Sequence, residues 1–89
     1  MARLYMVSAV PKRASLVARI ERALNREQDW FRYQDGLWIV ASVDSAEDIS
    51  EDLEPYVKPG GHIFVCRLDP SDFNGYMSTE FWDWLRRHP

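Results

Sequence analysis

Hydrophobic and polar positions alternate along this 89-residue chain in blocks that predict strands and helices in a definite order. Residues 4–10 are apolar on both alternating faces, which is typical of a central strand. Two further β-rich runs, residues 30–34 and 37–43, meet at Asp35-Gly36, a dipeptide suited to the positive φ angles of a tight hairpin turn. A last strand is predicted over residues 62–68.

Apolar residues recur at helical spacing in two segments between these strands. The first segment follows Pro11 and directs residues 16, 17, 20, 23 and 24 to one side. The second begins at Ser45, with Asp48 three residues later as an approximate capping box. We expect Pro55 to end this helix or to tighten its last turn, because proline supplies no amide hydrogen and clashes with the preceding turn.

A third helical pattern closes the chain. Ser78 stands at the N-cap position, and Phe81, Trp82 and Leu85 fall on one side of the helix, with Trp84 pointing elsewhere. The order is therefore βαββαβ with an extra C-terminal helix. It predicts an α+β fold of the ferredoxin-like type, with a four-stranded antiparallel sheet, as a single domain over residues 1–89.

The strands that are apolar on both faces require cover on both sides of the sheet. The two inner helices of a βαββαβ unit normally cover one face, so the other needs the C-terminal helix, a second copy of the chain, or both. We expect a homodimer, because closed two-fold pairs are the commonest assembly. The expected interface consists of aromatic residues: Tyr5, Trp30, Tyr33, Trp38, Trp82 and Trp84. Three of these, Trp30, Tyr33 and Trp38, could instead stack on exposed nucleic-acid bases.

Charge is distributed unevenly, although the net charge is only −3. Residues 1–40 carry seven Lys/Arg against four Asp/Glu, and residues 41–72 carry two against eight. Basic residues at the start and on the polar side of the first predicted helix could contact a phosphate backbone: Lys12, Arg13, Arg19, Arg22 and Arg26. Alternatively, they form a solvated face, or pair with the acidic second helix of a neighbouring molecule. That acidic helix could also mimic nucleic acid toward a basic host protein.

Cysteine content and hydropathy indicate a cytoplasmic protein without a membrane segment. Cys66 is the one cysteine, so no intrachain disulfide can form, and its place in a strand predicts a small buried hydrophobe. The first residues, MARLYMVSAV, lack the long apolar core of a signal peptide. No apolar run approaches the roughly 20 residues that span a bilayer.

Three carboxylates follow predicted strands and are the candidates for a metal site. Asp44 comes after the third strand, and Asp69 and Asp72 come after the fourth, so they could converge at one end of the sheet and bind Mg²⁺ or Mn²⁺. Their spacing matches no known metal motif, and solvated loop residues or a helix cap are the simpler interpretation. The two histidines, His62 and His88, have no sequence partner. The residues therefore identify no catalytic group and no cofactor.

Four segments carry a family resemblance over nearly the whole chain: YMVSAV, WFRYQDGLWIV, SAEDISEDLEPYV and FWDWLRRH. In this order and spacing they resemble small bacterial and phage-type proteins labelled SinR-like. These are similar to the small subunit of the CRISPR spacer-integration complex and to VapD-type ribonucleases. The resemblance implies a homodimer that cleaves nucleic acid with a metal held by an aspartate at the end of the first strand.

This chain departs from that pattern at the metal-binding position. Its first strand ends Ser8-Ala9-Val10, where the wider pattern resembles Ser-Tyr-Asp, so a valine replaces the acidic ligand. Valine offers no oxygen to a hard cation. We therefore expect a non-catalytic, homodimeric structural or protein-interaction module of mobile-element or antiviral-defence type. The alternative is a divergent metal-dependent endoribonuclease or a nucleic-acid-binding protein.

Overall fold

The computed structural model describes residues 1–88, and Pro89, the last residue of the expected domain, lies outside the described residues. Within this range the strands are β1 (Arg3–Val10), β2 (Asp29–Gln34), β3 (Leu37–Ser42) and β4 (His62–Arg67). The helices are α1 (Val17–Leu24), α2 (Ala46–Val57) and α3 (Thr79–Arg86), and a 3-10 turn, η1 (Ala14–Leu16), precedes α1. The strands differ from the sequence-based bounds by one residue at most.

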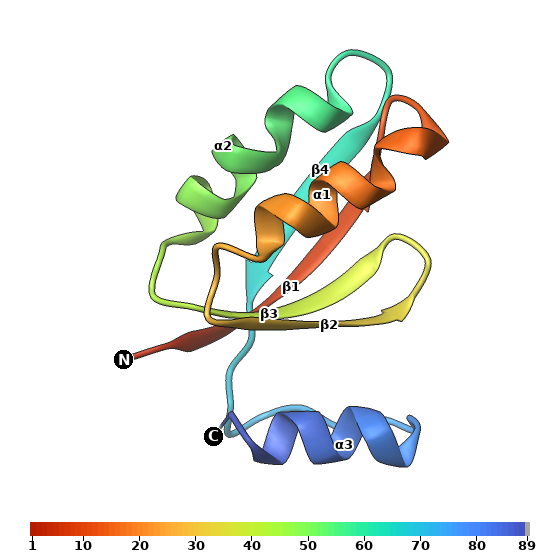
Figure 1. Ribbon diagram of the computed structural model, residues 1–89. Helices are drawn as coiled ribbons and strands as arrows, with labels where there is room; N and C mark the ends of the chain where they lie inside the picture. Colours follow the sequence, from red (N-terminus) through yellow and green to blue (C-terminus); the bar gives the residue numbers. More distant parts are fainter. Residues whose placement is uncertain (89) are drawn as a thin grey trace.

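The strands form an antiparallel sheet in the order β2-β3-β1-β4. Helices α1 and α2 lie on one face of this sheet, and α3 lies on the other (Figure 1). The described part of the chain thus confirms the α+β class and the four-stranded antiparallel sheet. Strands β2 and β4 lie at the two edges, so each has one side without a strand neighbour.

One apolar face of β1 enters the core beneath α1 and α2, and Leu4 of the other face enters a second core. Tyr5, Val7 and Ala9 are buried among apolar side chains of α1 and α2. Leu4, one position out of phase, packs instead with residues of α3. Successive side chains of a strand point to opposite faces, so β1 contributes to the core on each side of the sheet.

Glu21 of α1 joins the helix layer to the sheet. Its carboxylate oxygen Oε2 accepts a 2.9 Å hydrogen bond from the indole Nε1 of Trp38 and lies 3.2 Å from the guanidinium of Arg32. Trp38 is fully buried, and a buried indole N–H needs such an acceptor. The bond therefore fixes α1 over the central strands.

The hairpin between β2 and β3 uses one positive φ angle. Gly36 has φ of 79°, a conformation that glycine adopts without steric cost. Among residues 1–88 no other residue type has positive φ, so Asp35 does not share this conformation as the dipeptide suggested. A register shift between Arg32 and Gln34 absorbs the difference, because one extra residue bulges out of β2.

Helix α2 begins as predicted and continues past Pro55 to Val57. The Ser45 hydroxyl accepts from the Asp48 amide at 3.1 Å, and the Asp48 carboxylate accepts from the Ser45 amide at 3.4 Å, which completes the capping box. Pro55 lies inside the helix, which continues to Val57. Of the two expected effects of Pro55, ending the helix there does not occur; Pro55 lies in the last turn, which is held by the burial of Val57 and by the bond from the Lys58 amide to the Glu54 carbonyl.

None of the helices among residues 1–88 has the length and apolar character needed to cross a membrane. The longest, α2, has 12 residues.

Candidate interaction surfaces

Helix α3 covers only part of the second sheet face. Its buried side chains, Phe81, Trp84 and Leu85, pack on Ile39 and Ala41 of β3 and their neighbours. The structure corrects the expected orientation of Trp84, which is 4% exposed and lies in this core. Ring contacts at 6.2 Å join Phe31 to both Phe81 and Trp84. The helix therefore lies over the β2 and β3 half of the sheet.

Asp29 of β2 holds the end of α3. Its Oδ2 accepts from the indole Nε1 of Trp84 at 3.1 Å and lies 2.9 Å from Nε2 of His88. Its Oδ1 accepts from the amide of Trp30 at 2.8 Å. The His88 ring also packs on Trp84, with ring centroids 4.3 Å apart. No partner of His88 could be predicted from the sequence, because Asp29 lies 59 residues away.

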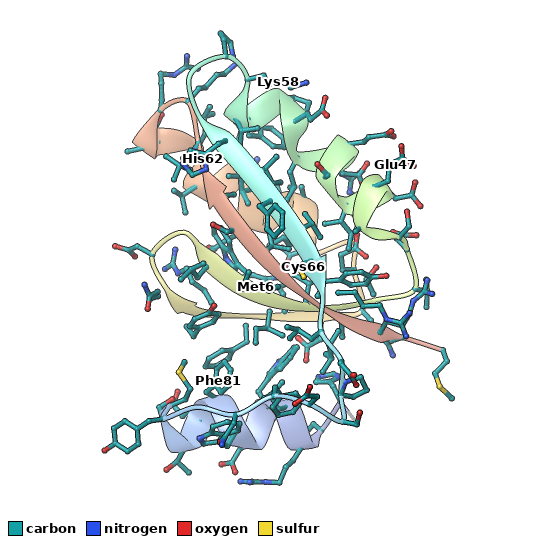
Figure 2. All side chains as sticks on the ribbon, turned by 180° about the vertical axis from the view of Figure 1, so that it is seen from behind. Met6, Glu47, Lys58, His62, Cys66 and Phe81 are labelled. Atoms are coloured by element: carbon teal, nitrogen blue, oxygen red, sulfur yellow. The ribbon has the colours of Figure 1, made fainter. Side chains whose placement is uncertain are left out.

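The other half of this face is open to solvent. Alternate residues of β1 and β4 point to the α3 side, and they pair in register as Met6 with Cys66, Ser8 with Phe64 and Val10 with His62. We call these six residues the open strip. Figure 2 shows β4 in front of β1, with Met6, His62 and Cys66 labelled along this strip. None of the six is Lys, Arg, Asp or Glu.

Large apolar side chains in the open strip are exposed. Phe64 is 62% exposed and Val10 is 47% exposed. Cys66 is exposed as well, so the prediction that it is a small buried hydrophobe is wrong. β4 is an edge strand and α3 stands over the opposite half of the sheet, so no described segment of the chain covers the thiol. This gap in the cover could not be read from the sequence of the strand.

An apolar groove of about 200 Å³ opens between the open strip and α3. Met6 and Ile39 of the sheet contribute to one side of the groove. Trp82 and Leu85 of α3 contribute to the other side, with Phe73 from the preceding loop. Phe73 and Trp82 stack with their ring centroids 6.4 Å apart. The groove is therefore an apolar recess at the border of the covered and uncovered halves.

The aromatic residues expected at a dimer interface are distributed over both cores. Tyr5 and Trp38 are 2% and 0% exposed in the core beneath α1 and α2, and Trp84 is buried beneath α3. These three are enclosed within one chain, so only the other three of the expected residues remain accessible to a partner. Trp30, Tyr33 and Trp82 are half-buried. Burial raises the pKa of the Tyr33 phenol, and its ring packs edge-on against Phe81 at 5.4 Å.

The basic residues divide into two groups. Arg19, Arg22 and Arg26 line a groove of about 320 Å³ between α1 and α2, together with Tyr56. Lys12 and Arg13 precede η1 and do not line this groove. The Arg26 guanidinium lies 3.9 Å from the Asp52 carboxylate, so one acidic residue of α2 reaches the groove. The three arginines nonetheless form a compact cationic surface.

The carboxylates proposed as metal ligands do not form a cluster. Among residues 1–88 no group of three or more His, Cys, Asp or Glu side chains could hold a metal ion, so Asp44, Asp69 and Asp72 do not together form such a site. Asp69 accepts from the Ser71 amide at 2.9 Å and from its hydroxyl at 2.7 Å. These bonds favour the ionised form, so they lower the pKa of Asp69. This arrangement is a local Asx turn.

A polar network that the sequence did not reveal joins the end of α1 to the end of β3. The Glu27 carboxylate accepts from the hydroxyl of Ser42, which is fully buried. The Ser42 hydroxyl accepts from the Asp44 amide at 2.9 Å, and the Tyr5 hydroxyl donates to the Asp44 carbonyl at 2.8 Å. Burial raises the pKa of Glu27, and the nearby charge of Asp44 adds to this. The charged form of Glu27 is therefore less favoured in the folded protein than in the unfolded chain.

Comparison with known proteins adds no relative to these observations. No protein-family model, no curated protein and no solved structure matches the chain. The open strip, the apolar groove beside α3 and the arginine groove are therefore the features from which a function can be argued.

Proposed function

We propose that this protein is a non-catalytic, homodimeric structural or protein-interaction module with a ferredoxin-like fold. Support for the fold comes from the βαββαβ order and from the strand order, in which β3 separates β1 from β2 and β1 separates β3 from β4. Each βαβ unit is thus split by a strand of the other. The mobile-element or defence setting rests on the resemblance of the four segments quoted above.

The observation that carries the dimer is the open strip, which contains no Lys, Arg, Asp or Glu and has Phe64 and Val10 exposed on the uncovered half of the sheet. Exposed apolar patches of this kind mark interaction sites. The open strip is two strands wide, at about 4.8 Å per strand, and six residues long, at about 3.4 Å per residue, so its flat area is roughly 200 Å². A stable interface buries about 800 Å² per partner. The contact must therefore extend over the α3 flank, and we expect micromolar affinity.

The absence of catalysis is supported by the end of β1. Val10 stands where the resemblance implies an acidic ligand, and its exposed side chain is hydrocarbon. Hard cations prefer oxygen donors. The position where the resemblance implies a metal ligand is instead part of the open strip. The hydrocarbon side chain of Val10 there suits contact with a protein surface.

Sedimentation equilibrium over about 1 to 500 µM protein tests the dimer, since micromolar affinity corresponds to roughly 8 kcal/mol. The wild type should shift from monomer to dimer, and Phe64→Glu should remain monomeric because a charge would be buried in the contact. Val43→Glu is the matched control, since Val43 is 64% exposed but lies after β3, outside the open strip. A wild type that stays monomeric throughout this range refutes the proposal.

The arginine groove favours a second candidate, a nucleic-acid-binding protein. The guanidinium groups of two arginines on α1 and of Arg26 just after it could contact successive phosphates, and Tyr56 lies beside them. Mobility shifts with labelled single-stranded RNA and double-stranded DNA test this function at two salt concentrations. Arg22→Glu should abolish a salt-sensitive complex, and Arg86→Glu on α3 should not. Absence of any shift at low salt excludes this candidate, because phosphate contacts are strongest there.

A further inference from the structure

We infer that the apolar groove beside α3 receives the Phe64 side chain of a second copy of this chain. This inference rests on the proposed dimer and specifies how its two copies meet. It draws on three observations: the groove and the open strip adjoin on one face, α3 stands above the sheet by about the spacing of two packed sheets, and the apolar groove has room for an aromatic ring such as that of Phe64, which is 62% exposed.

The first observation concerns position. Met6 belongs both to the open strip, where it pairs with Cys66, and to the lining of the groove. Phe64 lies two residues before Cys66 along β4, on the same face. A two-fold axis that runs along the strands of the open strip brings Phe64 of each copy toward the groove of the other. This self-complementarity is what a symmetric interface requires.

The second observation concerns how far α3 stands above the sheet. A sheet packs on another sheet at about 10 Å, and helix axes pack at similar distances of about 8–10 Å. Two copies can thus stack their uncovered β1 and β4 halves while each α3 stands beside the β4 edge of the partner. The outward residues of α3 are charged or polar, including Glu80, Asp83 and Arg86. Those residues remain in solvent in this arrangement.

The third observation concerns the occupant. The groove, at about 200 Å³, is lined mainly by apolar side chains and so suits one aromatic ring. The chain's own Phe73 forms part of its wall by stacking on Trp82. The chain's own Phe64 is not among the lining residues. Filling the groove from within the chain would therefore need a rearrangement, whereas a second copy supplies a ring that is already exposed.

Phe64→Ala is the direct test, measured as the dimer dissociation constant by sedimentation. The substitution removes two symmetry-related rings, so the dissociation constant should rise by about 100-fold or more. Val43→Ala, which shortens an equally exposed side chain outside the face, should leave it unchanged. Met6→Trp, which fills the groove from the sheet side, should weaken the dimer as well. Circular dichroism of each monomer verifies that the variants are folded.

The native thiol provides an independent measurement on the unmodified protein. Cys66 adjoins Phe64 in the open strip, so its reaction rate with a thiol reagent should fall as the wild type dimerises. In Phe64→Ala, at concentrations where the wild type is dimeric, the rate should match that of the monomer. A wild type that never dimerises refutes the proposed function. A dimer that forms with unchanged affinity in Phe64→Ala, or with Cys66 fully reactive, leaves the proposed function standing and overturns this inference.

Discussion

Replacing Asp29 with alanine should loosen α3 from the sheet. The carboxylate accepts hydrogen bonds from the Trp84 indole at 3.1 Å and the Trp30 amide at 2.8 Å, and it lies 2.9 Å from His88 Nε2. Trp84 is 4% exposed, so its N–H would lose its acceptor in a largely dry site. An unsatisfied buried donor costs about 1–3 kcal/mol, and a hydrogen bond contributes about 0.5–1.5 kcal/mol net.

The magnitude falls in the lower part of that range because the Asp29 side chain is 43% exposed. Water can enter where the carboxylate was and replace part of the lost bonding. We therefore expect the free energy of unfolding to fall by about 1–2 kcal/mol. For a domain of this size, with a total stability of about 5–10 kcal/mol, such a loss is readily measured.

Urea denaturation followed by circular dichroism measures this loss, and hydrogen exchange of α3 amides locates it. Asp83→Ala is the matched control, since its carboxylate pairs with Arg86 on the surface of the same helix and should matter by less than about 0.5 kcal/mol. In a Trp84→Phe background, which removes the indole donor, Asp29→Ala should cost about 1 kcal/mol less. Equal losses in both backgrounds, or a loss no larger than that of Asp83→Ala, refute the reasoning.

Three further predictions concern packing, capping and pH. Phe81→Ala should reduce the free energy of unfolding by about 3–5 kcal/mol in urea titrations, because it empties the core beneath α3. Ser45→Ala should reduce it by about 1 kcal/mol, since it removes the cap of α2; no measurable change would contradict the capping geometry. Burial raises the pKa of Glu27, so the native state binds a proton more tightly than the unfolded state. The free energy of unfolding therefore falls as the pH rises from the ordinary glutamate pKa through the raised one. Glu27→Gln should therefore raise the melting temperature at neutral pH and not at pH values below both pKa values, as measured in thermal scans; an equal effect at both pH values would contradict this.

The order of the elements was predictable because the signals that set it are local. The capping box at Ser45 and Asp48 lies within four residues, and the hairpin turn at Gly36 needs only a residue that tolerates positive φ. Pro55 shows the limit of such signals. Its local preference to end the helix is overridden by the burial of Val57 two residues later.

The candidate interaction surfaces were much less predictable, because their exposure depends on neighbours distant in the chain. Cys66 has the sequence surroundings of a buried strand residue and is exposed, since nothing described covers β4 on that face. The sequence places Trp84 away from the core, but it lies in the core beneath α3 and donates a hydrogen bond to Asp29, 55 residues earlier. Glu27 gave no signal, because its partner Ser42 lies across the end of the sheet.

The amino-acid order by itself determined that strands apolar on both faces would be covered by helices on one side and would need a further layer on the other. Alternation with a period of two is a property of each strand alone, which is why the sequence could settle it. Only the tertiary structure decided that α3 shelters the β2 and β3 half and leaves Phe64 in solvent. That outcome depends on which strand occupies the edge and on where one aspartate anchors the last helix, and both are set by pairings between segments far apart in the chain.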